Sequence, residues 1–290
     1  MENVQANLVS DQFGMMNTLP KFSGKNAVWL TFKNIAQSAF NLSESFDAAT
    51  GPVSMTLQSA TIVQKGRVYQ PSDLFKDTSI TGTMEKFMER LAYQAALAID
   101  TDVMGTVLSA GGSAQIAGTA VARNSLKKNS SFTFDIAEIR EATARLTGAN
   151  IPTFSDGMYA GLIHANAFYD LQGDTNFTDL FKYVEKGIER LWKGEQGQAY
   201  GVRLVKTSQA KVITDGASAG ASANVYQTPI FGPSWYGITK FQDLEVYVDS
   251  PDPTSALRMR DRIGWKTSYA RKELDSTRAV RVESTSSLGG

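Results

Sequence analysis

Few side chains in this sequence could carry out covalent or acid–base chemistry. His164 is the one histidine among 290 residues, and cysteine is absent, so disulfides and thiolate metal sites are excluded. A triad of serine, histidine and aspartate would therefore have to use His164. This residue lies inside the apolar run 158–168, which predicts a buried strand. We interpret His164 as a packed core or interface residue, and a small α+β hydrolase that uses it stays an alternative.

The acidic residues also lack the spacing of a metal site. Two pairs are close in sequence, Asp100 with Asp102 and Asp249 with Asp252. Neither pair has the spacing of a zinc site or of a calcium-binding EF-hand, so we interpret them as helix-surface and turn residues. The glycine pair at 111–112 follows a predicted helix instead of preceding one, which does not fit a phosphate-binding loop. We therefore expect no catalytic site, no metal, no cofactor and no enzyme activity.

The composition is that of a globular protein with balanced charge. Hydrophobic residues make up 42% and charged residues 20%, and 29 basic residues stand against 29 acidic ones. Zero net charge argues against a dedicated nucleic-acid binder and weakens repulsion between copies that pack closely. The start MENVQANLVSDQFG has no basic segment followed by an apolar run, so we expect no signal peptide. No window of about 18 apolar residues occurs, so we expect no contact with a membrane.

The element around which the other segments are arranged is a long helix predicted over residues 83–109. Apolar residues recur there at steps of three and four, and the glycine pair at 111–112 ends the pattern. At about 1.5 Å per residue this helix is about 40 Å long, so we expect it to cross a domain as a strut. The expected buried row is Met88, Ala92, Ala95, Ile99, Val103 and Val107, with Met84, Phe87 and Leu91 beside it.

Two segments before this helix lack a core of their own. Residues 1–50 are weakly patterned and predict an extended arm, with a floppy terminus as the alternative. Residues 51–78 alternate in polarity around Lys65-Gly66, which predicts a β-hairpin turning at Gly66. An ordinary edge hairpin of a larger sheet remains equally compatible with this pattern. We expect both segments to contact other copies of the chain through the hairpin tip and arm residues Lys65, Gly66, Arg67, Phe22 and Trp29.

The remaining chain predicts helices and strands in mixed order, which is typical of the α+β class. A second helix begins after Asp135, with Glu138 as its capping-box partner and an i,i+4 pair between Glu141 and Arg145. A third helix is predicted over 178–192, and the small-residue stretch 216–224 predicts an exposed loop. Strands are predicted at 114–121, 158–168, 202–206, 225–230, 244–248 and 279–282.

The end of the chain is mildly basic. From 254 to 290 there are eight basic and four acidic residues, a difference of four. A solvated face with ion pairs explains such a count, and a phosphate-facing patch is the alternative. The candidate residues for an inner face that meets nucleic acid are Arg258, Arg260, Arg262 and Lys266.

Several longer stretches of the sequence have distinctive patterns. The most specific are GEQGQAYGVRLVKTS at 194–208 and SPDPTSALRMRDRIGWKTSYARKELDSTRAVRVES at 250–284. Further stretches are YQPSDL at 69–74, MYAGLIHANAFYDL at 158–171 and IFGPSWYGITK at 230–240. Together they resemble one protein family, the major capsid proteins of tailed phages with the Hong Kong 97-type fold. The similarity spans about residues 50–285 and is closest to a short, podophage-like subgroup.

The resemblance implies an α+β capsid fold made of four parts. These are an N-terminal arm at 1–50, an extended hairpin loop at 51–78, a peripheral domain with the spine helix at 79–131 and 236–290, and an axial domain at 132–235.

It also implies self-assembly as hexamers and pentamers into an icosahedral virion shell around double-stranded DNA, inside the host bacterial cytoplasm. A separate scaffolding protein, a portal and decoration proteins would be the partners. An encapsulin-like cellular compartment shares the fold and is the alternative function.

Overall fold

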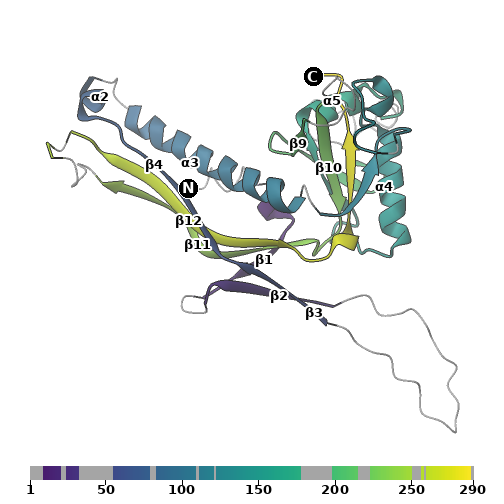
Figure 1. Ribbon diagram of the computed structural model, residues 1–290, viewed down its shortest axis with the longest axis horizontal. Coiled ribbons are helices and arrows are strands. Elements are labelled where there is room, and N and C mark those ends of the chain that lie inside the picture. The colour runs from purple at the N-terminus through teal and green to yellow at the C-terminus, as the bar shows by residue number, and fades with distance from the viewer. Residues whose placement is uncertain are drawn as a thin grey trace, which may run out of the picture.

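The structure is a computed structural model of the whole chain. It describes residues 9–20, 24–32, 55–78, 83–108, 111–120, 122–177, 198–214, 223–249, 256–257 and 259–288. These residues form an elongated body, a second lobe at one end of it and a small two-stranded sheet that projects from it (Figure 1).

The predicted long helix is confirmed. Helix α3 spans Thr83–Val103 and continues through one π-helical turn, Met104–Leu108. Leu91 and Ala95 are buried against strand residues Ile263 and Trp265, so the helix lies along a sheet as a strut (Figure 1). The expected buried row is only partly right: Ala95, Val103 and Val107 are buried, but Met88 is 38% exposed. Leu91, which was expected beside the row, is buried against the sheet.

A four-stranded sheet carries α3 on one face, with the strand order β1-β11-β12-β4. Strands β11 and β12 form a long antiparallel pair, of which the sequence pattern predicted only residues 244–248. Register shifts in β11 between Lys240 and Glu245 interrupt the alternation of side chains, which explains why the pattern predicted only part of that strand. The stretch around Gly264-Trp265, expected between strands, lies inside β12. The bounds are β1 Met15–Thr18, β4 Val63–Tyr69, β11 Tyr236–Asp249 and β12 Arg262–Glu273.

The predicted hairpin that turns at Gly66 is wrong. Strand β3 (Met55–Thr61) pairs with β2 (Asn26–Phe32), whereas β4 pairs with β12, and only Ile62 separates β3 from β4. The chain therefore passes straight from one sheet into another. Gly66 does not adopt a positive φ; it lies opposite Lys266, where a Cβ atom would clash with the backbone oxygen of Trp265. The glycine is needed for close approach of two strands, which its sequence neighbours do not reveal.

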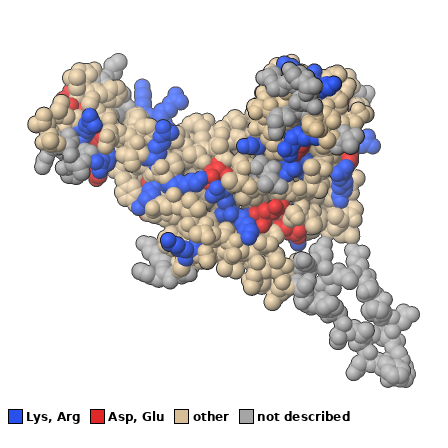
Figure 2. Space-filling view, in the orientation of Figure 1, with Lys and Arg blue, Asp and Glu red and all other residues tan. Residues whose placement is uncertain are grey.

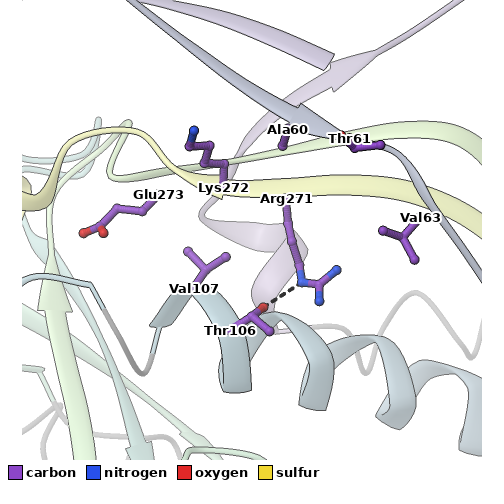
Figure 3. A pocket seen from close by; sticks show the side chains of 8 residues that line it. All are labelled: Ala60, Thr61, Val63, Thr106, Val107, Arg271, Lys272 and Glu273. Carbon is purple, nitrogen blue, oxygen red and sulfur yellow. Dashed lines mark hydrogen bonds between the residues drawn. The ribbon is translucent and has the colours of Figure 1, made fainter. Parts of the chain in front are cut away.

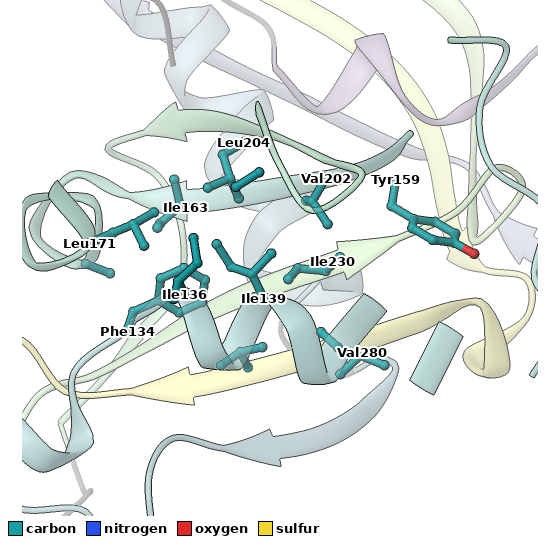
Figure 4. Close-up of a cluster of buried hydrophobic side chains, with 14 of the residues drawn as sticks. Phe134, Ile136, Ile139, Tyr159, Ile163, Leu171, Val202, Leu204, Ile230 and Val280 are labelled. Carbon is teal, nitrogen blue, oxygen red and sulfur yellow. The ribbon is translucent and has the colours of Figure 1, made fainter. Parts of the chain in front are cut away.

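The second lobe is a seven-stranded sheet covered by helices. Its strands follow the order β5-β13-β10-β6-β8-β7, with β9 paired to β10. Helix α4 packs on this sheet, and the side chains labelled in Figure 4 converge between them. The bounds are β5 Ser113–Ile116, β6 Tyr159–His164, β7 Gln198–Ala199, β8 Val202–Thr207, β9 Val212–Ile213, β10 Val225–Phe231, β13 Ala279–Ser284, α4 Ile136–Gly148 and α5 Ala165–Gly173.

Local signals in this lobe were right at some points and wrong at others. Asp135 caps α4 by accepting hydrogen bonds from the N–H groups of Ala137 and Glu138, as predicted. Glu138 does not complete a capping box, because its carboxylate binds Gln115 and the Gly118 N–H. The predicted strand at 158–168 ends at His164, where α5 begins. The predicted helix at 178–192 and loop at 216–224 lie outside the described residues, apart from Ala223 and Asn224.

Short elements complete the fold. Helix α2, Asp73–Thr78, lies at the far end of the body from the second lobe (Figure 1), within the segment 51–78 that the sequence pattern assigned to a hairpin. Single 3-10 turns occur at Ser10–Gln12, Ser130–Phe132 and Ser276–Arg278. The four domain bounds expected from the resemblance stay a prediction. The sheet β2–β3 joins one strand from the expected arm at 1–50 to one from the expected loop at 51–78.

Candidate assembly surfaces

The two-stranded sheet β2–β3 leaves one apolar face in solvent. Side chains alternate between the faces of a strand, so Val28, Leu30 and Phe32 share a face with their cross-strand neighbours Leu57 and Met55. All five are exposed, up to 69% for Leu57. Contiguous apolar surface of this kind marks a contact site more often than a free surface.

The other face of this sheet holds it to the body. Trp29 is 2% exposed and packs with Ala270 and Leu274. A Cβ atom at Gly237 would lie 2.6 Å from the Trp29 indole nitrogen, so a glycine there makes room for the ring. The expectation that Trp29 contacts another copy is therefore wrong, because its own chain buries it. Phe22 lies outside the described residues.

Part of the expected arm also folds onto its own chain. Ser10 and Phe13 are buried, and β1 pairs in parallel with residues 237–240 of β11. The prediction that residues 1–50 form an arm that finds its partners elsewhere is therefore wrong for residues 9–18. The sequence offered no signal for this, since the partners of this segment lie about 90 to 230 positions away.

The three residues expected at a hairpin tip lie instead at the edge of the four-stranded sheet. Among the described strands, β4 pairs only with β12, so its other edge is open. Lys65 forms an ion pair with Asp102 of α3, and the Arg67 guanidinium lies 5.3 Å from the centre of the Tyr69 ring. Together with Gly66 they line a groove of about 770 Å³ between β4 and α3. Both cations are thus engaged within their own chain.

The far tip of the body carries a second apolar surface, which the sequence analysis missed. The N–H of Asp73 donates to the Met259 oxygen and that of Asp261 to the Pro71 oxygen, so α2 and residues 259–261 lie side by side. The exposed apolar side chains of this part are Val68, Leu74, Phe75, Leu257 and Met259. The sequence did contain a signal for this surface, namely the large apolar residues Leu74 and Phe75. Neither is buried within the chain, because α2 has no buried residue.

Three of the four residues expected in a basic inner-face patch are described, and the patch itself stays a prediction. The backbone of Arg260 forms an isolated β-bridge with that of Ser72, Arg262 lies opposite Asp249 in the β11–β12 pair, and the Lys266 ammonium lies 5.0 Å from the centre of the Tyr247 ring. Arg258 lies outside the described residues. On the face drawn in Figure 2, basic side chains form several separate groups with acidic ones between them. This distribution fits a solvated face with ion pairs better than a phosphate-binding surface.

His164 serves as a helix cap. It lies at the junction of β6 and α5, where its Nδ1 accepts a hydrogen bond of 3.1 Å from the Asn166 N–H. Its ring centre lies 4.8 Å from that of Tyr226, and burial lowers the pKa of the imidazole, which favours the neutral form. A capping acceptor needs that form, so the local structure explains the residue without a catalytic role.

The sequence Gly-Ala-Ser-Ala-Gly at 216–220, which has the letters of a nucleophile elbow, lies outside the described residues. Over the part of the chain that the structure describes, no group of three metal-ligating side chains occurs and no helix is long and apolar enough to cross a membrane.

The carboxylate of Asp102 joins three elements close to the π-helical turn. It accepts hydrogen bonds from Tyr269 and Arg271 of β12 and pairs with Lys65 of β4. Arg271 also donates from Nε to the Thr106 hydroxyl at 2.6 Å (Figure 3). Burial and the hydrogen bond to Asp102 raise the pKa of Tyr269, so its hydroxyl stays a donor. A cavity of about 390 Å³ lies beside this cluster, lined in part by Thr106, Arg271 and Lys272.

Comparison with known proteins identifies the fold. No protein-family model and no curated protein sequence matches the chain. Among solved structures, the chain is similar to one in the capsid of Ralstonia phage GP4, with a TM-score of 0.74 and 10% identity, over 94% of this chain and 87% of the other. It is similar to one in the capsid of cyanophage P-SCSP1u, with a TM-score of 0.66 and 15% identity, over 93% and 85%.

A third similar structure is the acid-stable capsid of the Helicobacter pylori bacteriophage KHP30. It has a TM-score of 0.67 and 12% identity, over 94% of this chain and 87% of the other. The three similarities span nearly the whole length of both chains. The chain therefore has the Hong Kong 97-type capsid fold, and the predicted α+β class is confirmed.

Proposed function

We propose that this chain is the shell subunit of a tailed phage and assembles as hexamers and pentamers into an icosahedral shell around double-stranded DNA. The observation that carries the proposal is the similarity in fold to capsid chains over 93–94% of its length. Fold alone does not imply function, so the argument also needs surfaces that fit assembly.

The first such surface is the apolar face of β2–β3. A two-stranded sheet is at best marginally stable in water, and this one is held through a single face. Full burial of a large apolar side chain stabilises by about 1.5–3 kcal/mol, so five half-exposed ones leave several kcal/mol for a partner to supply. A second copy of the chain is the partner that a shell provides.

The second surface is the apolar tip around α2, and it lies at the opposite end of the body from the second lobe (Figure 1). Two different apolar surfaces on one chain suit contacts in which each copy presents one patch to one neighbour and another patch to the next. Contacts of this kind close into rings when the rotation between copies allows it. Hexamers and pentamers are such rings.

The remaining parts of the proposal follow from charge and chemistry. Zero net charge lets many copies pack closely, and scattered basic groups suit weak contacts to DNA without sequence specificity. We propose no enzyme activity and no cofactor. A separate scaffolding protein, a portal and decoration proteins are the expected partners, with assembly in the bacterial cytoplasm and residence in the virion.

The test is assembly of the full chain, expressed alone and together with the scaffolding protein encoded beside it. Negative-stain microscopy and sedimentation velocity should detect closed shells or rings of six and five copies. A chain that stays monomeric under both conditions contradicts the proposal. Shells that enclose a protein cargo and are encoded without a terminase or portal would favour the encapsulin-like alternative.

A further inference from the structure

Residues 9–18, which we call the N-terminal strap, are tied to α3 through one buried carboxylate. Asp100 is 1% exposed, and it accepts hydrogen bonds from the N–H groups of Val9 and Ser10 and from the Ser10 hydroxyl. These distances are 3.1, 3.1 and 2.6 Å. A buried carboxylate without donors would be costly, so Asp100 favours the docked strap.

The strap is also tied to the four-stranded sheet. The Tyr236 hydroxyl donates to the Ser10 backbone oxygen at 2.6 Å, and Lys240 pairs with Asp11 at 2.6 Å. Strand β1 then continues beside β11. A Cβ atom at Gly14 would lie 2.7 Å from the Tyr236 ring, so the strap lies closely on this aromatic side chain. Contacts to α3 and to β11 thus come from the same few residues.

The strap also contacts the second lobe, through the side chain of Phe13. Its ring centre lies 5.8 Å from that of Phe154 and 6.0 Å from that of Phe231, both edge-on. The Arg203 guanidinium lies 5.2 Å from the centre of the same ring. Residues 154, 203 and 231 belong to the second lobe, whereas Asp100 and Lys240 belong to the body. One short segment therefore bridges the two parts of the molecule.

We propose that the N-terminal strap acts as a clasp that fixes the angle between the elongated body and the second lobe. The strap covers the apolar cluster that joins the two parts, in which Val103 of α3 and Met104 of the π-helical turn meet Phe231 and Trp235. The clasp is either docked or released, because partial release leaves Asp100 buried without its donors or leaves the apolar cluster uncovered. This inference concerns the single chain and does not depend on the proposed function.

The absence of cysteine allows a direct test on the full chain. Two cysteines, Tyr93→Cys on α3 and Tyr169→Cys on α5, replace exposed side chains in the body and in the second lobe. Spin labels on them, diluted with unlabelled protein, report the distance between the two parts. The test variant is Ser10→Ala with Phe13→Ala. The control is Met16→Ala, which changes an exposed strap side chain outside these contacts.

In the parent and in the control, we expect one narrow distance distribution and slow amide exchange in residues 15–18 and 237–240. In the test variant, exchange in both stretches should be at least about tenfold faster, which corresponds to about 1.4 kcal/mol. The distance distribution should broaden or gain a second population.

Two results would overturn the clasp. One is a narrow, unshifted distribution in a variant whose exchange proves that the strap is released. The other is unchanged exchange in the test variant, because Ser10 and Phe13 would then not hold the strap.

Discussion

Asp100 and Asp102 lie two residues apart in α3 and hold different parts of the molecule to that helix. The Asp100 carboxylate accepts a hydrogen bond of 2.6 Å from the Ser10 hydroxyl, whereas the Asp102 carboxylate accepts one of 2.7 Å from the Tyr269 hydroxyl. Residues two positions apart on an α-helix differ by a rotation of about 200° around the helix axis, so the two carboxylates lie on nearly opposite sides of α3. The end of α3 is thereby fixed between the N-terminal strap and β12.

Replacing Asp102→Asn should destabilise the fold by about 1–3 kcal/mol, because Arg271 and Lys65 lose a charged partner at a largely buried position. Urea unfolding measures this change. Asp243→Asn, which removes an exposed carboxylate of β11, is the control and should change stability by less than about 0.5 kcal/mol. Equal stability of both variants would mean that the Asp102 cluster contributes nothing to the fold.

Replacing Gly66→Ala should destabilise the fold by about 1–3 kcal/mol, because the new methyl group clashes with the Trp265 backbone oxygen and pushes β4 from β12. Thermal unfolding of the variant and the parent measures this loss of stability. Gly105→Ala is the matched control, since a Cβ atom there would meet nothing within 4 Å outside its own stretch of helix. The control should be neutral or slightly stabilising, as expected of alanine in a helix. A harmless Gly66→Ala would contradict the close approach of β4 and β12 at this position.

Glu283 should make the fold sensitive to acid. Burial alone would raise the pKa of this carboxyl, but the hydrogen bond and charge of Arg123, with Arg281 and Gln227, hold it below its usual range. A depressed folded-state pKa contributes stability above the unfolded-state pKa, and this is lost as the pH falls through the folded-state pKa. The stability lost by Glu283→Gln, measured by urea unfolding at several pH values, should therefore shrink toward acid pH. A pH-independent difference would contradict this.

Glu138 should behave in the opposite way. Burial, with the charges of Asp135 and Glu141, raises its pKa despite hydrogen bonds from Gly118 and Gln115. Stability linked to a raised pKa is present below the unfolded-state value and is lost as the pH rises through the folded-state value. The difference between the parent and Glu138→Gln should thus be largest at acid pH and decrease upward. If the stability difference between the parent and the glutamine variant changed with pH in the same direction for Glu138 and Glu283, the opposite pKa shifts of the two carboxyls would be refuted.

Replacing Leu57→Asp should block assembly while leaving the single chain folded, because a charge would have to be buried where the apolar face of β2–β3 meets a neighbour. Sedimentation velocity and circular dichroism measure the two effects. Tyr169→Asp, which places the same charge at a similarly exposed position of α5, is the control. Normal shells from Leu57→Asp would show that this face is not an interface.

The sequence was sufficient for the two longest described helices, whose signals are local. The periodicity of residues 83–109 and the cap at Asp135 predicted α3 and α4, because helix hydrogen bonds and caps join residues a few positions apart. The overall class came from the order of the predicted elements, and the resemblance to capsid proteins came from longer stretches of sequence.

Strand partners and buried contacts depended on residues far apart in the chain, which local patterns do not specify. β3 and β4 are separated by one residue yet join different sheets, and Trp29 looked available for contact until Ala270 and Leu274 were seen to cover it. The strap meets Asp100 and Tyr236 only after α3 and β11 are in place. Such contacts form because folding removes both partners from water at the same time. The residues next to either partner in the sequence do not indicate which distant residue it will contact.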